Sequence, residues 1–173
     1  MIGSTVDGLL LRPLDPSDSL EALTELVHRA YAELAAMGLR YWATHQDVQD
    51  TARRAADGEC VVAVSGPALV GTLTLMPPDR ADGADWYARP EVASFGQFAV
   101  EPDRQRAGIG SMLLDWAEVR AAHLGASELA LDTAESAHHL IAMYQRRGYR
   151  FIDHVDWRPH VNYRSVILSK TLV

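Results

Sequence analysis

The chain has 173 residues, of which 48% are apolar and 23% charged, ordinary values for a globular domain that buries its own core. Its formal charge of −7 argues against a nucleic-acid-binding module, because such modules neutralise phosphates with an excess of Lys and Arg. The longest apolar runs are too short to span a bilayer, and the first residues lack the basic and apolar segments of a secretory signal. We therefore expect one domain, residues 1–173, in the cytoplasm, with no membrane or nucleic-acid partner.

The N-terminal half predicts one strand, two helices and a hairpin. Asp18 with Glu21 forms a capping-box pattern, and apolar residues at helical spacing come after it up to Gly38. Thr44 with Asp47 gives a weaker start signal for the second helix. The expected elements are a strand at 9–14, helices at about 18–38 and 44–56, and paired strands at 59–65 and 69–76.

The C-terminal half begins after a polar, turn-rich loop at 77–90 and alternates strands with helices. Gly125 and Gly148 stand directly after two amphipathic segments, where glycine commonly ends a helix. The expected elements are strands at 92–100, 128–132, 149–155 and 163–169, and helices at 109–124 and 137–147. This order, β-α-α-β-β-β-α-β-α-β-β, is typical of a mixed α/β or α+β domain.

Cysteine and histidine residues give no sign of a metal site. The single cysteine, Cys60, lies in an apolar strand and predicts a buried, inert thiol. Adjacent His138 and His139 point to different sides of a helix, and no Cys and His residues have metal-ligand spacing. We therefore expect no metal.

The stretch R-Q-R-A-G-I-G lies between a predicted strand and a predicted helix. A helix start has unpaired amides and partial positive charge, glycines allow a ligand to approach the main chain, and Arg104, Gln105 and Arg106 add donors. It is no dinucleotide fingerprint, since Leu113 replaces the third glycine, and it lacks the Gly-Lys-Ser/Thr ending of a triphosphate loop. The pattern indicates a phosphate cradle of another design; an ordinary glycine-rich turn is the alternative.

Residues 98–114, F-A-V-E-P-D-R-Q-R-A-G-I-G-S-M-L-L, resemble the acetyl-CoA motif of the GNAT (Gcn5-related) N-acetyltransferase superfamily, Q/R-x-x-G-x-G/A. Gln105, Gly108 and Gly110 fill its three defining places. About forty residues later, M-Y-Q-R-R-G-Y-R-F at 143–151 resembles the family's L-Y-x-x-x-G-F element. The resemblance implies a central mixed, mostly antiparallel sheet of about seven strands flanked by four helices.

The same resemblance implies an N-acetyltransferase that moves an acetyl group from acetyl-CoA to a primary amine of a small molecule or peptide, by direct attack in a ternary complex. The amides of 106–110 would hold the pyrophosphate, strand 98–100 would pair with the pantetheine arm, and the Val100 N–H would polarise the thioester carbonyl. Tyr144 would protonate the leaving thiolate, although its place on the apolar helix face also fits a core tyrosine. The implied cofactor-binding residues are Phe98, Ala99, Val100, Arg104, Gln105, Arg106, Ala107, Gly108, Ile109, Gly110 and Ser111.

The general base stays open. Ser94 and Gln97 lie in the strand where some family members carry a glutamate, and neither is a base. A water relay is one possibility, and the candidate side chains are Glu91, Asp132, Glu135, His138, His154 and His160. Ala137 stands where family members often have Asn, so cofactor binding should depend more on the loop, and on Ser136 or His138.

The acceptor is also open. Aromatic residues either line an acceptor wall or complete the core or a dimer interface; they are Tyr41, Trp42, Trp86, Tyr87 and Trp157. A homodimer formed through the C-terminal strands is possible in this fold. Two other functions compete with an enzyme: a non-catalytic acyl-CoA-binding sensor of the same fold, and an unrelated nucleotide-binding domain.

Overall fold

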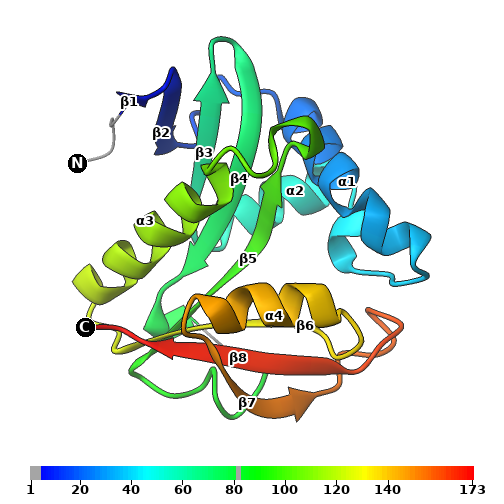
Figure 1. The fold of residues 1–173 in the computed structure, drawn as a ribbon, viewed down its shortest axis with the longest axis vertical. Coiled ribbons are helices and arrows are strands. Elements are labelled where there is room, and N and C mark those ends of the chain that lie inside the picture. Colours follow the sequence, from blue (N-terminus) through cyan, green and yellow to red (C-terminus); the bar gives the residue numbers. More distant parts are fainter. Residues whose placement is uncertain (1–4, 81–82) are drawn as a thin grey trace.

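A single eight-stranded sheet runs through the computed structural model, which describes residues 5–80 and 83–173 (Figure 1). Its strand order is β1-β2-β3-β4-β5-β6-β8-β7. The strands are β1 (Thr5–Val6), β2 (Leu9–Pro13), β3 (Glu59–Ser65), β4 (Ala68–Met76), β5 (Val92–Val100), β6 (Glu128–Ala134), β7 (Arg150–Val155) and β8 (Ser165–Thr171). The α-helices are α1 (Leu20–Ala36), α2 (Val48–Ala56), α3 (Ile109–His123) and α4 (His138–Arg146).

This architecture confirms the mixed, mostly antiparallel sheet with four helices. Among the described strands only β5 and β6 pair in parallel, and every other neighbouring pair is antiparallel. The eighth strand is the two-residue β1, which is too short to leave a periodic signal in the sequence. No described helix combines the length and the apolarity that crossing a membrane requires.

The predicted N-caps of the first two helices were wrong, Asp18 by one residue and Thr44 by three. Ser19, not Asp18, caps α1, because its hydroxyl accepts from the Ala22 N–H at 3.0 Å. Asp18 instead forms a two-point ion pair with Arg12, at 2.7 and 2.8 Å, whose charge keeps the pKa of the Asp18 carboxyl below its ordinary value. A serine next to an aspartate gives two capping signals, and the competing arginine on β2 selects between them.

The second helix begins after Asp47 rather than at Thr44. Asp47 accepts from the Asp50 N–H at 2.7 Å, and Asp50 accepts from the Asp47 N–H at 3.1 Å, which is a complete capping box. Thr44 ends a separate 3-10 turn, η1 (Trp42–Thr44). The segment from η1 to α2 is therefore a turn joined to a firmly capped helix, and it forms one wall of the candidate site.

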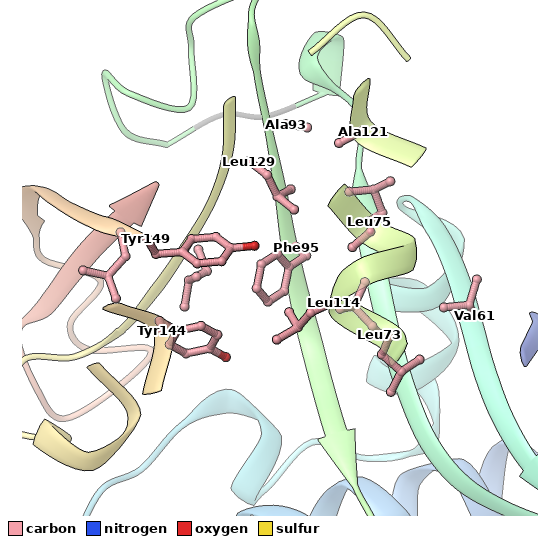
Figure 2. Close-up of a cluster of buried hydrophobic side chains, with 14 of the residues drawn as sticks. Val61, Leu73, Leu75, Ala93, Phe95, Leu114, Ala121, Leu129, Tyr144 and Tyr149 are labelled. Carbon is pink, nitrogen blue, oxygen red and sulfur yellow. The ribbon is translucent and has the colours of Figure 1, made fainter. Parts of the chain in front are cut away.

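Alternating side chains of β3 place a hydrophobic core on each face of the sheet. Val61 and Ala63 pack in the cluster beneath α3, whereas Val62 and Val64 pack against Leu23 of α1. Figure 2 shows the larger cluster, which extends from the α3 face to tyrosines at and just after α4. Cys60 is 8% exposed, which confirms the buried thiol.

The feature that positions the site is the end of the pairing between β5 and β6. The two strands pair at only three positions, the last of which joins Ser94 to Ala130. Beyond it β5 contains a bulge at Gln97, whose φ is +49°, so that residues 97 and 98 together oppose Leu73 of β4. The bulge turns β5 away, and the two strands diverge widely in Figure 1.

Candidate functional site

A cleft of about 630 Å³ opens where β5 and β6 separate. Its walls come from the second half of β5, the middle of β6, α1, the η1–α2 segment, the loop before α3, α4, and the segment 157–163. Because the parallel pairing has ended, the facing edges of β5 and β6 are open to a ligand. Elements far apart in the sequence thus converge on one space.

The loop at 101–110 has the concave backbone that a phosphate cradle needs. Arg106 has a φ of +69°, and Gly108, the N-cap of α3, has a φ of +84°. Left-handed residues close together turn neighbouring N–H groups toward one side, and the first amides of α3 have no partner within the helix. Gln105 braces the loop by donating to the Val100 carbonyl at 3.5 Å. The fold therefore fits an anion at this helix start.

The structure separates the predicted cofactor-binding residues into groups. Those that line the cleft are Phe98, Ala99, Val100, Gln105, Arg106 and Gly110. Ala107, Gly108 and Ser111 are exposed around the start of α3, and Ile109 is 1% exposed and packs in the core. Arg104 is not on the cleft wall; its Nη1 lies 3.4 Å from the Ser65 hydroxyl.

Tyr144 belongs both to the core and to the cleft wall. It is 6% exposed, its ring centroid lies 6.2 Å from that of Phe95 and 5.7 Å from that of Tyr149, and it also lines the cleft (Figure 2). No described residue forms a hydrogen bond with its hydroxyl. The Tyr144 phenol is protonated near neutral pH even at its ordinary pKa of 10.0, and burial raises its pKa well above that value. The core and catalytic interpretations are therefore compatible.

Among the six candidate bases, only Asp132 and His160 line the cleft. Asp132 accepts from the Tyr87 hydroxyl at 2.7 Å and from the Trp157 indole N–H at 3.2 Å. Asp132 is exposed to the open side of the cleft, but the surrounding walls limit its solvation, and this desolvation raises the pKa of its carboxyl above the ordinary 3.8.

The other four candidates lie outside the cleft. Glu91 is 3.6 Å from Arg89 in an ion pair, His154 and Glu135 are 3.5 Å apart, and His138 is exposed. None of these four lines the cleft. The expected aromatic wall is partly present, because Tyr41, Trp42 and Trp157 line the cleft, whereas Trp86 and Tyr87 pack behind it.

Two further groups at the site left no signal in the sequence. Tyr31 of α1 donates its hydroxyl to the Phe98 carbonyl at 3.0 Å. Arg54 of α2 donates to the Gln46 side-chain oxygen at 2.7 Å, and Gln46 in turn donates to the Gln97 side chain at 2.9 Å. These residues form no motif, and only the packing of α1 against β5 and of α2 against α1 and β3 brings them to the cleft.

No three His, Cys, Asp or Glu side chains within residues 5–80 and 83–173 come together as they would around a metal ion. The polar groups of the cleft instead include the Tyr144 phenol, the Asp132 carboxylate, the guanidinium groups of Arg54 and Arg106, the His160 imidazole and a set of amides. These groups suit proton transfer and the binding of charged ligands.

Comparison with known proteins gives consistent matches. Residues 20–149 match the model of the acetyltransferase (GNAT) family. The chain is 34% identical over 132 residues to S-(2-succino)cysteine N-acetyltransferase of Bacillus subtilis, covering 75% of this chain and 77% of that protein.

Solved structures show the same fold. A GNAT family acetyltransferase from Elizabethkingia anophelis with acetyl-CoA bound matches with a TM-score of 0.65 and 17% identity, over 96% of this chain and 100% of that one. The ribosomal-protein-S18-alanine N-acetyltransferase of Escherichia coli matches with a TM-score of 0.70 and 17% identity, over 95% and 94% of the two chains.

The effect of the Arg54 charge should be measurable as a change in the pKa of Asp132. Arg54 lowers the pKa of Asp132 while burial raises it, so Arg54→Gln removes the lowering effect and should move the carboxyl to a still higher pKa. Carbon-detected NMR titration of Asp132 measures this directly. The matched control is Arg53→Gln, which removes the same charge one residue away, from an exposed side chain paired with Asp50. A wild-type pKa below 3.8, or equal shifts in the two variants, would contradict this electrostatic picture.

Proposed function

The chain belongs to the GNAT acetyltransferase family and is an acetyl-CoA-dependent N-acetyltransferase, and on that premise we propose how its residues carry out the reaction. The observation that supports the proposal is the single cleft at the β5–β6 separation. One end of it is the amide-rich start of α3, and Asp132 lies on the facing strand, with Tyr144 on the wall. Acetyl-CoA and the amine that accepts the acetyl group can therefore bind side by side in one cleft.

The loop end fits the cofactor. The unpaired amides at the start of α3 and the Arg106 side chain are suited to hold the pyrophosphate of acetyl-CoA. Gly110 has no side chain, and a Cβ there would lie 3.4 Å from the Phe98 ring, so the wall beside β5 stays open. Residues 98–100 then provide the edge along which the pantetheine arm lies, and the Val100 N–H polarises the carbonyl. Acetyl-CoA supplies the acetyl group as a thioester.

Asp132 and Tyr144 take the two proton-transfer roles. Asp132 attracts the cationic amine and accepts one of its protons, which frees the lone pair that attacks the acetyl carbon. The nitrogen loses its second proton as the amide forms, and that proton goes to the solvent or restores the Tyr144 phenol after Tyr144 has protonated the sulfur. Tyr144 is a phenol at neutral pH, and it donates its proton to the departing sulfur. The carboxylate is held in place by Tyr87 and Trp157, which leave its open side toward the cleft.

The acceptor that we propose is a small-molecule amine rather than a polypeptide. The curated relative from Bacillus subtilis is named for the N-acetylation of S-(2-succino)cysteine, which supports this choice. The cytoplasmic location, a single domain over residues 1–173 and a homodimer stay predictions. For the homodimer the relevant feature is β7, the edge strand next to β8, whose exposed backbone suits pairing with a second copy.

Arg106 should contribute to acetyl-CoA binding and Arg104 should not. Arg106→Ala is expected to weaken binding about tenfold, because it removes a charged donor that lines the cleft. Arg104→Ala removes the same charge two residues away, from a side chain directed at Ser65, and should change the affinity less than about twofold. Isothermal calorimetry with acetyl-CoA distinguishes them. An equal or larger loss in Arg104→Ala would refute this division of roles.

Tyr144→Phe should lower kcat by about a hundredfold, because it removes the proton for the sulfur but keeps the ring. The dissociation constant for acetyl-CoA should stay nearly unchanged. Tyr149→Phe is the matched control, since Tyr149 is also buried in this cluster but bonds to Glu118 and does not line the cleft. Thiol release in steady state measures the rate; a Tyr144→Phe enzyme as fast as Tyr149→Phe would exclude Tyr144 as the acid.

A further inference from the structure

The Arg54 guanidinium lies beside the point where β5 bends away from β6. Its Nη2 lies beside Gly96 of β5, 3.5 Å from the place that a Cβ would occupy, which is an ordinary contact distance. Arg54 lines the cleft, and its only hydrogen bond to a described residue runs from Nη1 to Gln46. Nε and Nη2 therefore keep N–H donors that no described residue uses.

The orientation of the neighbouring amides is set by Arg54. A guanidinium can only donate, so the Gln46 atom that it contacts is the oxygen, and the Gln46 nitrogen must face Gln97. Gln97 therefore accepts the hydrogen bond from Gln46 with its side-chain oxygen, and its amide nitrogen is left as an unused donor. That nitrogen has no partner among the described residues, although Gln97 is only 2% exposed and lines the cleft. Unsatisfied buried donors are uncommon and require an explanation.

Trp42 adds a third donor to the same wall. Its indole N–H is buried without a partner among the described residues, and its ring lines the cleft. Arg54 thus has unused N–H donors at this wall, and Gln97 and Trp42 each have a buried N–H without a partner among the described residues. The opposite wall has the opposite character, because Asp132 provides carboxylate oxygens. No ion pair joins Arg54 to Asp132 in the described part of the chain, so each charge remains available to a ligand.

We propose that the acceptor of this N-acetyltransferase carries a carboxylate group, which the Arg54 guanidinium binds while the reacting amine faces Asp132. The substrate class is therefore an amino acid or a related small amine acid, with both charges matched by the cleft. This inference rests on the proposed function for the place of the amine, and it adds the group that selects the substrate. A local cation is needed here, because a protein with a net charge of −7 otherwise repels an anionic acceptor.

Acetyl-CoA bound at the α3 end of the cleft would not use the N–H donors of Arg54. The phosphates of acetyl-CoA fit the amides and Arg106 at the start of α3, whereas Arg54 lies on α2 over Gly96, before the bulge in β5. An arginine also matches the two oxygens of a carboxylate in a planar, bidentate contact. A neutral peptide carbonyl would use one donor and leave the charge unpaired.

The test compares acids with matching amides. Initial rates are measured by thiol release for the standard amino acids and for their carboxamides, which keep the amine and the side chain. In the wild type the acid of the preferred pair should exceed its amide in kcat/KM by at least about tenfold. Arg54→Gln should lose at least about tenfold more on the acid than on the amide, because the change in the pKa of Asp132 affects both substrates whereas the lost carboxylate contact affects only the acid; Arg54→Lys should fall between the wild type and Arg54→Gln. Arg53→Gln is the control that removes a charge from the outer side of α2.

A binding measurement makes the test independent of turnover. Calorimetry of the CoA-loaded protein with succinate and with uncharged succinamide should show binding of succinate alone, lost in Arg54→Gln and kept in Arg53→Gln. The inference is overturned if succinate binds Arg54→Gln as well as the wild type, if it fails to bind the wild type, or if Arg54→Gln slows acids and amides equally. Normal melting temperature and acetyl-CoA affinity of each variant show that it is folded.

The two outcomes separate the two proposals. If amines are acetylated with the predicted Tyr144 dependence but carboxylates have no advantage, the carboxylate site fails and the proposed function stands. If succinate binding depends on Arg54 but no amine is acetylated through Asp132 and Tyr144, the catalytic roles fail and the carboxylate site stands.

Discussion

The whole site depends on the hydrogen bonding between β5 and β6 stopping after Ser94 and Ala130. Two adjacent parallel strands would normally continue their ladder and leave no space between them. Here the bulge at Gln97 redirects β5, and the core packing of α3 and α4 holds the two halves of the sheet apart. Arg54, Asp132 and Tyr144 then line the space that the missing ladder has opened.

The bulge has a second consequence, because it sets the polarity of the cleft. Gln97 sits at the bulge and its side chain is buried against Gln46 of the η1–α2 connection. That contact ties β5 to α2, and α2 carries Arg54. The residue that opens the sheet therefore also positions the cation, while Asp132 on β6 provides the anion across the gap. The bulge at Gln97 therefore determines both the path of β5 and the position of the Arg54 charge.

Periodic patterns and local motifs were predictable from the sequence. The apolar run of β3, the apolar stripe of α3 and the glycines after α3 and α4 located these elements to within a few residues, since local chemistry decides them. The R-Q-R-A-G-I-G stretch likewise predicted a concave helix start, which its left-handed residues now show. Helix starts were less certain, because Asp18 and Ser19 both offer a cap and only the tertiary partner Arg12 distinguishes them.

The rest of the site depends on long-range packing. Arg54, Tyr31 and Asp132 lie on three elements, and nothing in their local sequence separates them from surface charges or core aromatics. Asp132 was one of six equal candidates until the fold placed only Asp132 and His160 on the cleft wall. For Tyr144 the sequence presented a core position and a catalytic position as alternatives. In the structure Tyr144 lies at the edge of the core, where it is buried and also lines the cleft.

The most direct test of the proposed site is a crystal structure of the protein with CoA bound. We expect the pyrophosphate on the amides at the start of α3 beside Arg106, and the pantetheine arm along residues 98–100. The sulfur should lie next to the Tyr144 hydroxyl, with Asp132 facing the remaining space. A pyrophosphate bound away from the start of α3, or a sulfur remote from Tyr144, would contradict this assignment.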